Sequence, residues 1–113
     1  MEKNVKISIL LDIYGKLLTE KQYKLLEDYY NNDLSLSEIA ENENITRQAV
    51  RDNLKKGENK LFEYEEKLGI MKKTLMQEET ISTILSEISK IEHSSSDKEI
   101  ANILQDVKNK LNC

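Results

Sequence analysis

The fold is decided between residues 35 and 50, where the sequence reads SLSEIAENENITRQAV. Ser35 and Glu38 have the S-x-x-E spacing of a capping box, which predicts the start of a very short helix ending near Glu41. Residues 42–44 (NEN) break that helix, and Thr46 is a natural N-cap for the longer helix that follows. A short helix, a tight turn and a longer helix together predict a helix-turn-helix.

The side chains around this turn favour the same motif. The two helices of a helix-turn-helix cross closely, and Ala40 supplies the small side chain that the contact needs. Asn44 can adopt the left-handed conformation of the turn, although Gly would do so at lower cost. Four apolar residues are spaced to fill the wedge between the helices: Ile39, Ile45, Val50 and Leu54. An ordinary helical hairpin without a ligand is the competing interpretation.

The composition of the 113-residue chain favours helices and excludes several classes of protein. It has no Pro, no Trp and only three Gly, which argues against a turn-dense β-fold. No apolar run approaches the roughly 20 residues of a membrane span, and Asp12 interrupts the stretch that a signal peptide would need. Cys113 is the single Cys, and one His beside it leaves too few ligands for zinc. We expect a cytoplasmic, reducing setting, no membrane insertion, no metal and no cofactor.

Amphipathic segments on both sides of the motif predict an all-α fold. The first helix spans about residues 5–18, and its buried face consists of Ile7, Leu10, Leu11, Tyr14, Leu17 and Leu18. The same helix has a second apolar row, Val5, Ile9 and Ile13. This row is either a surface for a partner or a second protomer, or it is buried under the C-terminal helices.

A further helix lies between the first one and the motif. It begins at a capping box in residues 19–22 (TEKQ) and ends at residues 31–33 (NND). Tyr23, Tyr29 and Tyr30 on this helix can be interpreted as base-stacking residues. Their spacing beside Leu25 and Leu26 favours core packing instead.

The segment after Gly69 predicts two more amphipathic helices. The first has a seam of apolar residues, Ile81, Ile84, Leu85, Ile88 and Ile91. The second starts at a capping box in residues 96–99 (SDKE), and its apolar side consists of Ile100, Ile103, Leu104, Val107 and Leu111. The seam is too short for a free coiled coil, so the helices either fold back on the first helix or pair between protomers.

Charge is distributed unevenly along this acidic chain. The net charge is −4, but residues 46–60 contain five basic and two acidic residues and carry +3, so the remainder carries −7. A cationic segment on an anionic body is consistent with one confined surface for a polyanion. A solvated helix face balanced by nearby acids is an equal alternative.

The predicted second helix of the motif, about residues 46–67, has side chains suited to nucleic acid. Its first residues, Thr46, Arg47 and Gln48, are placed to reach base edges, while Arg51, Lys55 and Lys56 are placed to meet phosphates. Asp52 opposes this interpretation because it brings negative charge to the same surface. Gly57 is a weak point that costs about 1 kcal/mol relative to Ala. A monomer with so few phosphate contacts would bind weakly, so specific operator binding would need a dimer.

Three segments, residues 18–22 (LTEKQ), 34–40 (LSLSEIA) and 45–50 (ITRQAV), resemble the YlxM-like family of small bacterial helix-turn-helix proteins. That family is similar to the promoter-reading C-terminal (region 4) domain of sigma factors, and its genes neighbour those of the signal recognition particle. The resemblance is strongest over residues 5–68. It implies an all-α, cytoplasmic non-enzyme with a sigma-like fold and a regulatory role in that pathway.

Together these observations predict two domains and two candidate functions. Residues 1–69 form a helix-turn-helix domain, winged-helix-like or sigma-region-4-like, and residues 70–113 form a helical extension that packs on it or on a second protomer. The first function is an accessory protein of the signal recognition particle pathway that binds the particle's RNA or protein. The alternative is a sequence-specific DNA-binding transcriptional regulator acting as a homodimer. Catalysis is not expected, because the chain has no Gly-rich phosphate loop and no second His to activate a nucleophile.

Overall fold

The computed structural model describes residues 1–94 and 97–112, and in this part of the chain it contains helices and no β-strand. The predicted all-α class is therefore confirmed, and no β-hairpin wing accompanies the motif within the described residues. The chain divides into two compact units, Met1–Lys72 and Lys73–Cys113. Among the described residues no helix is both long and apolar enough to span a membrane.

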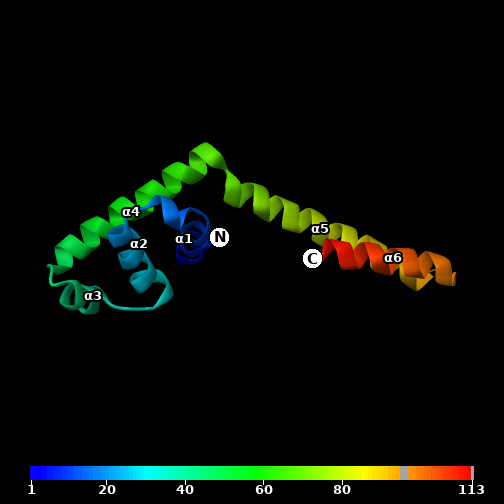
Figure 1. Cartoon of the computed structure of the whole chain (residues 1–113), viewed down its shortest axis with the longest axis horizontal. Coiled ribbons are helices and arrows are strands. Elements are labelled where there is room, and N and C mark those ends of the chain that lie inside the picture. Colours follow the sequence, from blue (N-terminus) through cyan, green and yellow to red (C-terminus); the bar gives the residue numbers. More distant parts are fainter. Residues whose placement is uncertain (95–96, 113) are drawn as a thin grey trace. The chain divides into compact units, whose positions relative to one another are not determined.

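The first unit is built around one long helix. Figure 1 shows α1 (Lys3–Tyr14), α2 (Glu20–Leu26) and α3 (Leu36–Glu43) gathered along α4 (Arg47–Leu68). Their facing sides form a core whose fully buried members are Ile7, Leu10, Leu11, Tyr14, Leu25, Leu26, Ile39, Val50 and Leu61. The apolar periodicity of the first helix correctly predicted its buried residues, with the exception of Leu17.

Leu17 is 55% exposed because the predicted first helix tightens before it ends. After α1 the chain forms a 3₁₀ turn, η1 (Gly15–Leu17), which changes the direction of the following side chains and leaves Leu18 buried instead. Gly15 sits at the start of this turn, where an added Cβ would lie only 2.7 Å from Cε2 of Tyr23. A side chain at this position would therefore displace the Tyr23 ring.

The capping box at residues 19–22 is confirmed, with Thr19 and Gln22 exchanging both hydrogen bonds. The helix then widens into a π-helical turn, η2 (Glu27–Asn31), closed by a hydrogen bond from Asn32 N to Glu27 O. The wider turn rotates the side chains that follow. Tyr29 lies in this turn and is 37% exposed, so its expected burial is wrong. The expected burial is also wrong for Tyr23, which precedes the turn and is 41% exposed.

The helix-turn-helix itself forms as predicted. Ser35 Oγ accepts from Glu38 N, and Ser35 N donates to the Glu38 carboxylate, which completes the capping box of α3. Asn44 adopts the left-handed conformation at φ 54°, and Thr46 Oγ1 accepts from Ala49 N at 3.0 Å to begin α4. Helix α3 runs two residues further than expected, to Glu43, because Asn44 alone makes the turn.

Gly57 has a different role from the predicted weak point. It is buried where α2 crosses α4, and a Cβ at this position would lie 2.8 Å from Leu26 Cδ1. Missing side-chain volume at Gly57 is thus what allows the two helices to approach.

Helix α4 ends at Gly69, in the left-handed conformation, and α5 (Ile70–Ser94) begins at once. The first residues of α5 belong to the first unit and are held there by Glu65. Its carboxylate accepts from Tyr14 Oη at 2.7 Å, from Met71 N at 2.9 Å and from Lys72 N at 3.1 Å. Ile70 N in turn donates to Tyr14 Oη at 3.1 Å.

The second unit is a helical hairpin of the remaining part of α5 and α6 (Lys98–Leu111). Within it α6 runs back beside α5 (Figure 1), and Lys108 Nζ pairs with a Glu92 carboxylate oxygen at 3.2 Å. The N-cap of α6 is Asp97, which accepts from Glu99 N. Ser96, the predicted start of a capping box, lies outside the described residues.

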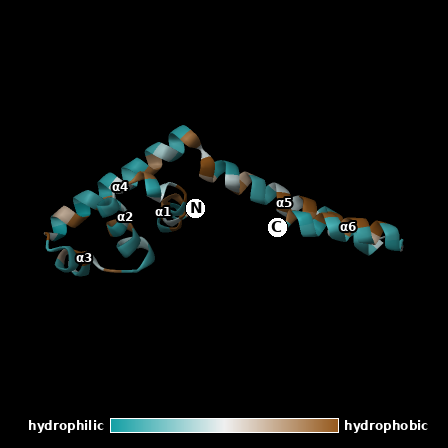
Figure 2. Cartoon of the chain, viewed as in Figure 1, coloured by the Kyte–Doolittle hydropathy of each residue, from teal (hydrophilic) through white to brown (hydrophobic). Residues whose placement is uncertain are grey.

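The hairpin buries only part of its apolar surface. Ile88 is buried, and Ile81, Leu85, Leu104 and Leu111 are half-buried. Figure 2 shows hydrophobic residues distributed along both helices, and several of them stay exposed: Ile84, Ile91, Ile100, Ile103 and Val107.

Candidate nucleic-acid interface

The six residues expected to contact nucleic acid all lie at the N-cap and in the first turns of α4, and all six are exposed. Their local roles differ. Thr46 caps the helix, so its oxygen already accepts a backbone hydrogen bond. Gln48 Nε2 donates to Asp52 Oδ1 at 2.9 Å. A Gln side chain recognises adenine through both the oxygen and the nitrogen of its amide. Gln48 would therefore have to break its hydrogen bond to Asp52 before it could contact an adenine.

Three cations of α4 form one row. Successive residues of an α-helix are about 100° apart, so positions four residues apart share a face. Arg47, Arg51 and Lys55 have this spacing, and we call them the basic row. Lys56 lies about 100° further round the helix, away from the row. No ion pair occupies any member of the basic row among the described residues.

A hollow of about 450 Å³ lies beside the basic row, and we call it the α4 groove. Helix α4 contributes Arg51, Lys55, Glu58 and Phe62 to its lining. The other segments contribute Lys3 from α1, Tyr29 and Tyr30 from η2, and Leu36 from α3. Tyr29 and Tyr30 meet edge to face, with ring centroids 5.0 Å apart. The structure thus places an exposed aromatic ring and two cations of the basic row on one groove.

Glu58 is the acidic residue of this groove. Its carboxylate accepts a hydrogen bond from Tyr30 Oη. Partial burial raises the pKa of Glu58 above its ordinary value, and the nearby Lys3 acts in the opposite direction. Sequence reasoning missed the groove because its walls come from four segments, and no short motif links them.

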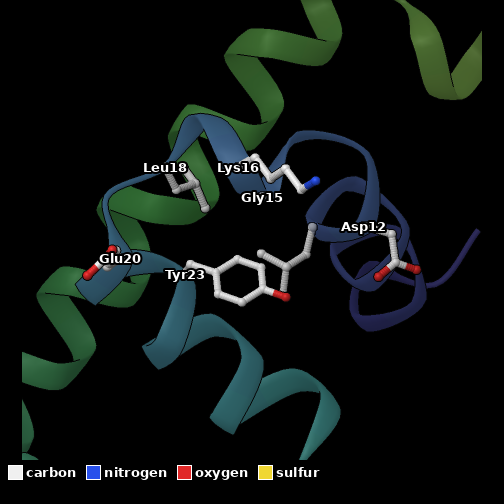
Figure 3. Close-up of a pocket in the computed structure, with 7 residues that line it drawn as sticks. Asp12, Gly15, Lys16, Leu18, Glu20 and Tyr23 are labelled. Atoms are coloured by element: carbon white, nitrogen blue, oxygen red, sulfur yellow. The ribbon is translucent and has the colours of Figure 1, made fainter.

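A second hollow, of about 490 Å³, lies between the end of α1 and the start of α2. Figure 3 shows the Tyr23 ring lying across it, with Asp12 and Glu20 on opposite sides of the ring. Leu11 and Leu18 complete its apolar part. With two carboxylates and only Lys16 as a cation, this hollow does not suit a polyanion.

A short capped helix, a left-handed Asn and a long second helix with exposed cations define a helix-turn-helix protein. Residues 1–110 match the family model described as "Putative helix-turn-helix protein, YlxM / p13 like". The chain belongs to this family, UPF0122, which confirms the resemblance that its motifs predict.

Curated relatives agree with this membership over nearly the whole chain. A UPF0122 protein of Acetivibrio thermocellus is 46% identical over 111 residues, covering 98% of this chain and 95% of the relative. One of Clostridium novyi is 42% identical over 109 residues, covering 96% and 95%. One of Fusobacterium nucleatum is 51% identical over 80 residues, covering 69% and 78%. These names state no ligand, so the function rests on the site.

Proposed function

We propose that this protein is a non-enzymatic accessory protein of the signal recognition particle pathway and that it contacts the particle's RNA through the basic row. The observation that carries the proposal is the row itself, three exposed cations without ion-pair partners among the described residues, on a chain of net charge −4. Such a surface attracts a polyanion locally while the acidic remainder repels it. The pathway is supported by the gene neighbourhood of the family that the chain resembles.

Within this proposal the first unit is a sigma-region-4-like module that is reused for docking, since a fold does not fix its ligand. The bond between Gln48 and Asp52 favours this interpretation over base readout in duplex DNA. Three phosphate contacts predict affinity that falls about 20- to 40-fold between about 50 and 200 mM salt.

The alternative function, a dimeric DNA-binding regulator, draws on a different observation. The hairpin of α5 and α6 leaves apolar residues exposed, and a second protomer would cover them. In this proposal residues 70–113 pair between protomers and bring two copies of α4 to two half-sites. The same pairing is compatible with binding to the particle, so the ligand decides between the functions.

The test is binding of labelled protein to the reconstituted signal recognition particle, with and without excess mixed-sequence duplex DNA. We expect binding that survives the DNA. Loss of all particle binding, together with salt-dependent binding to the DNA, would establish the alternative instead.

The triple variant Arg47→Ala, Arg51→Ala and Lys55→Ala tests the basic row within that experiment. It should abolish binding with an unchanged helical spectrum, because all three substituted side chains are exposed. The matched control, Lys21→Ala, Lys73→Ala and Lys90→Ala, removes the same charge from exposed positions outside α4 and should bind like the wild type. If both triple variants lost binding to the same extent, net charge and not the basic row would govern binding.

A further inference from the structure

The α4 groove combines two chemical features, a pair of cations and an exposed aromatic ring. Arg51 and Lys55 line it one turn apart on α4, and Lys3 lines it from α1. The 450 Å³ of the groove falls in the range of about 300–1,000 Å³ that small ligands occupy. Its cations suit an anion, and its volume suits a small ligand such as a single nucleotide.

Tyr29 supplies the second feature, an aromatic side chain that is partly exposed to solvent. The side chain is 37% exposed although it lines the groove. Its ring is supported from the side by Tyr30, whose hydroxyl is bonded to Glu58. A ring held in this way can stack on a nucleobase with little loss of side-chain entropy.

A base in a continuous duplex is already stacked on its neighbours and cannot reach such a ring. An unpaired base in a bulge, loop or single strand can be splayed out onto an aromatic side chain while its phosphate meets Arg or Lys. The single acid of this arrangement, Glu58, is engaged by Tyr30 and lies near Lys3, which reduces its repulsion of a phosphate.

We infer that the α4 groove binds one unpaired nucleotide, with its base stacked on Tyr29 and its phosphate held by Arg51 and Lys55. This inference rests on the proposed function, because it uses two cations of the basic row. It adds what the row alone does not provide, a preference for unpaired over paired nucleic acid.

The experiment compares three labelled probes with the full-length protein: an RNA hairpin with one bulged nucleotide, the same hairpin fully paired, and a short oligothymidylate. The wild type should prefer the bulged hairpin. Tyr29→Ala should weaken binding of the bulged hairpin about 5- to 150-fold, the range for one base–aromatic stack. Binding of the fully paired hairpin should not change. Equal affinity for oligothymidylate would assign the groove to any unpaired nucleotide, and weaker affinity would assign it to RNA.

Two controls separate stacking from folding. Tyr29→Phe keeps the ring and should bind like the wild type. Tyr23→Ala removes a ring of similar exposure outside the groove and should keep the preference for the bulged hairpin. If Tyr29→Ala loses helical signal, Tyr29→Leu replaces it, because Leu retains apolar volume without an aromatic face. A preference for the bulged hairpin that persists in Tyr29→Ala or in Tyr29→Leu overturns the inference.

The inference and the proposed function fail in different ways. If the wild type binds both hairpins equally and the Arg47, Arg51 and Lys55 triple variant binds neither, the basic row stands and the nucleotide site does not. If the wild type binds none of the probes and no particle RNA, both proposals fall together.

Discussion

At the scale of single residues, Glu65 joins three parts of the first unit. Its carboxylate accepts hydrogen bonds from Tyr14 of α1 and from two backbone N–H groups of α5, so it caps α5 from the preceding helix. Burial alone would raise the pKa of Glu65, but these hydrogen bonds outweigh it and hold the pKa below its ordinary value. For Tyr14, burial and the neighbouring Glu65 carboxylate raise the pKa of the phenol.

The lowered pKa of Glu65 predicts a pH-dependent contribution to stability. A carboxylate whose pKa is lower in the folded state stabilises the fold above its unfolded pKa, and this contribution is lost as the pH falls through the folded pKa. Glu65→Gln should therefore lower the free energy of unfolding by about 1 kcal/mol at neutral pH and by much less in acid. Thermal melts followed by circular dichroism at several pH values measure this, with a loss of about 4–8 °C expected near neutrality.

Glu66→Gln is the matched control, since it removes a neighbouring, exposed carboxylate. It should melt like the wild type across the same pH range. A difference between Glu65→Gln and the wild type that stays constant into acid would show that the charge of Glu65 is not what caps α5.

The residues that sequence reasoning identified correctly are those whose role is local. Asn44, Ser35 and Thr46 act on backbone groups within a few positions, so their spacing alone predicts their structure. Glu65 acts on residues 6 and 7 positions away and on Tyr14, 51 positions away, and nothing in the spacing of acids on α4 distinguishes it. Tyr29 was assigned to the core because its exposure depends on the π-helical turn, which has no clear sequence signal.

At the scale of elements, the crossing of α2 and α4 is decided by Gly57. Gly in a helix interior costs about 1 kcal/mol relative to Ala, so helix propensity by itself favours replacement. Against this, an added methyl would lie 2.8 Å from Leu26 Cδ1, and Leu26 is fully buried. Overpacking a core typically costs about 1–3 kcal/mol, which exceeds the gain in propensity.

Gly57→Ala is therefore expected to destabilise the protein by up to about 2 kcal/mol, in spite of its better helix propensity. The same substitution in a Leu26→Ala background should stabilise by about 1 kcal/mol, because the clashing side chain is gone. Chemical denaturation of the wild type, both single variants and the double variant measures this coupling. A Gly57→Ala protein that is more stable than the wild type would contradict a close contact between Gly57 and Leu26 at the α2–α4 crossing.

Helix boundaries show the same division between local and tertiary causes. The starts of α2, α3 and α4 follow from their caps, which the sequence displays. The end of α1 does not, because Gly15 packs against the Tyr23 ring of the next helix, a contact that no local motif displays. Candidate site residues follow this rule as well: their place on α4 was predictable, but the walls that α1, η2 and α3 add to the α4 groove were not.

At the scale of the whole molecule, the hairpin of α5 and α6 has more apolar surface than it covers. Each of its helices has a half-buried row and a second, exposed set of apolar residues, among which Ile91 is 49% and Ile103 is 58% exposed. Exposed apolar stripes on a helical hairpin are typical of surfaces that associate, and pairing of identical surfaces about a two-fold axis covers both at once. This is the physical basis of the proposed homodimer.

Ile103→Asp tests the homodimer, since each dimer would contain the substitution twice. Losing two buried aliphatic side chains at about 1.5–3 kcal/mol each weakens dimerisation about 100-fold or more, while the exposed position leaves the hairpin folded. Light scattering coupled to size exclusion should show a dimer for the wild type and a monomer for the variant.

Asn102→Asp is the matched control, since it adds the same charge about 100° round α6 from Ile103, and it should remain dimeric. Leu85→Asp, at a half-buried position, should instead lower the melting temperature of the hairpin. A monomeric wild type, or a dimer that Ile103→Asp leaves intact, would contradict pairing through this surface and leave the extension as a folded part of one protomer.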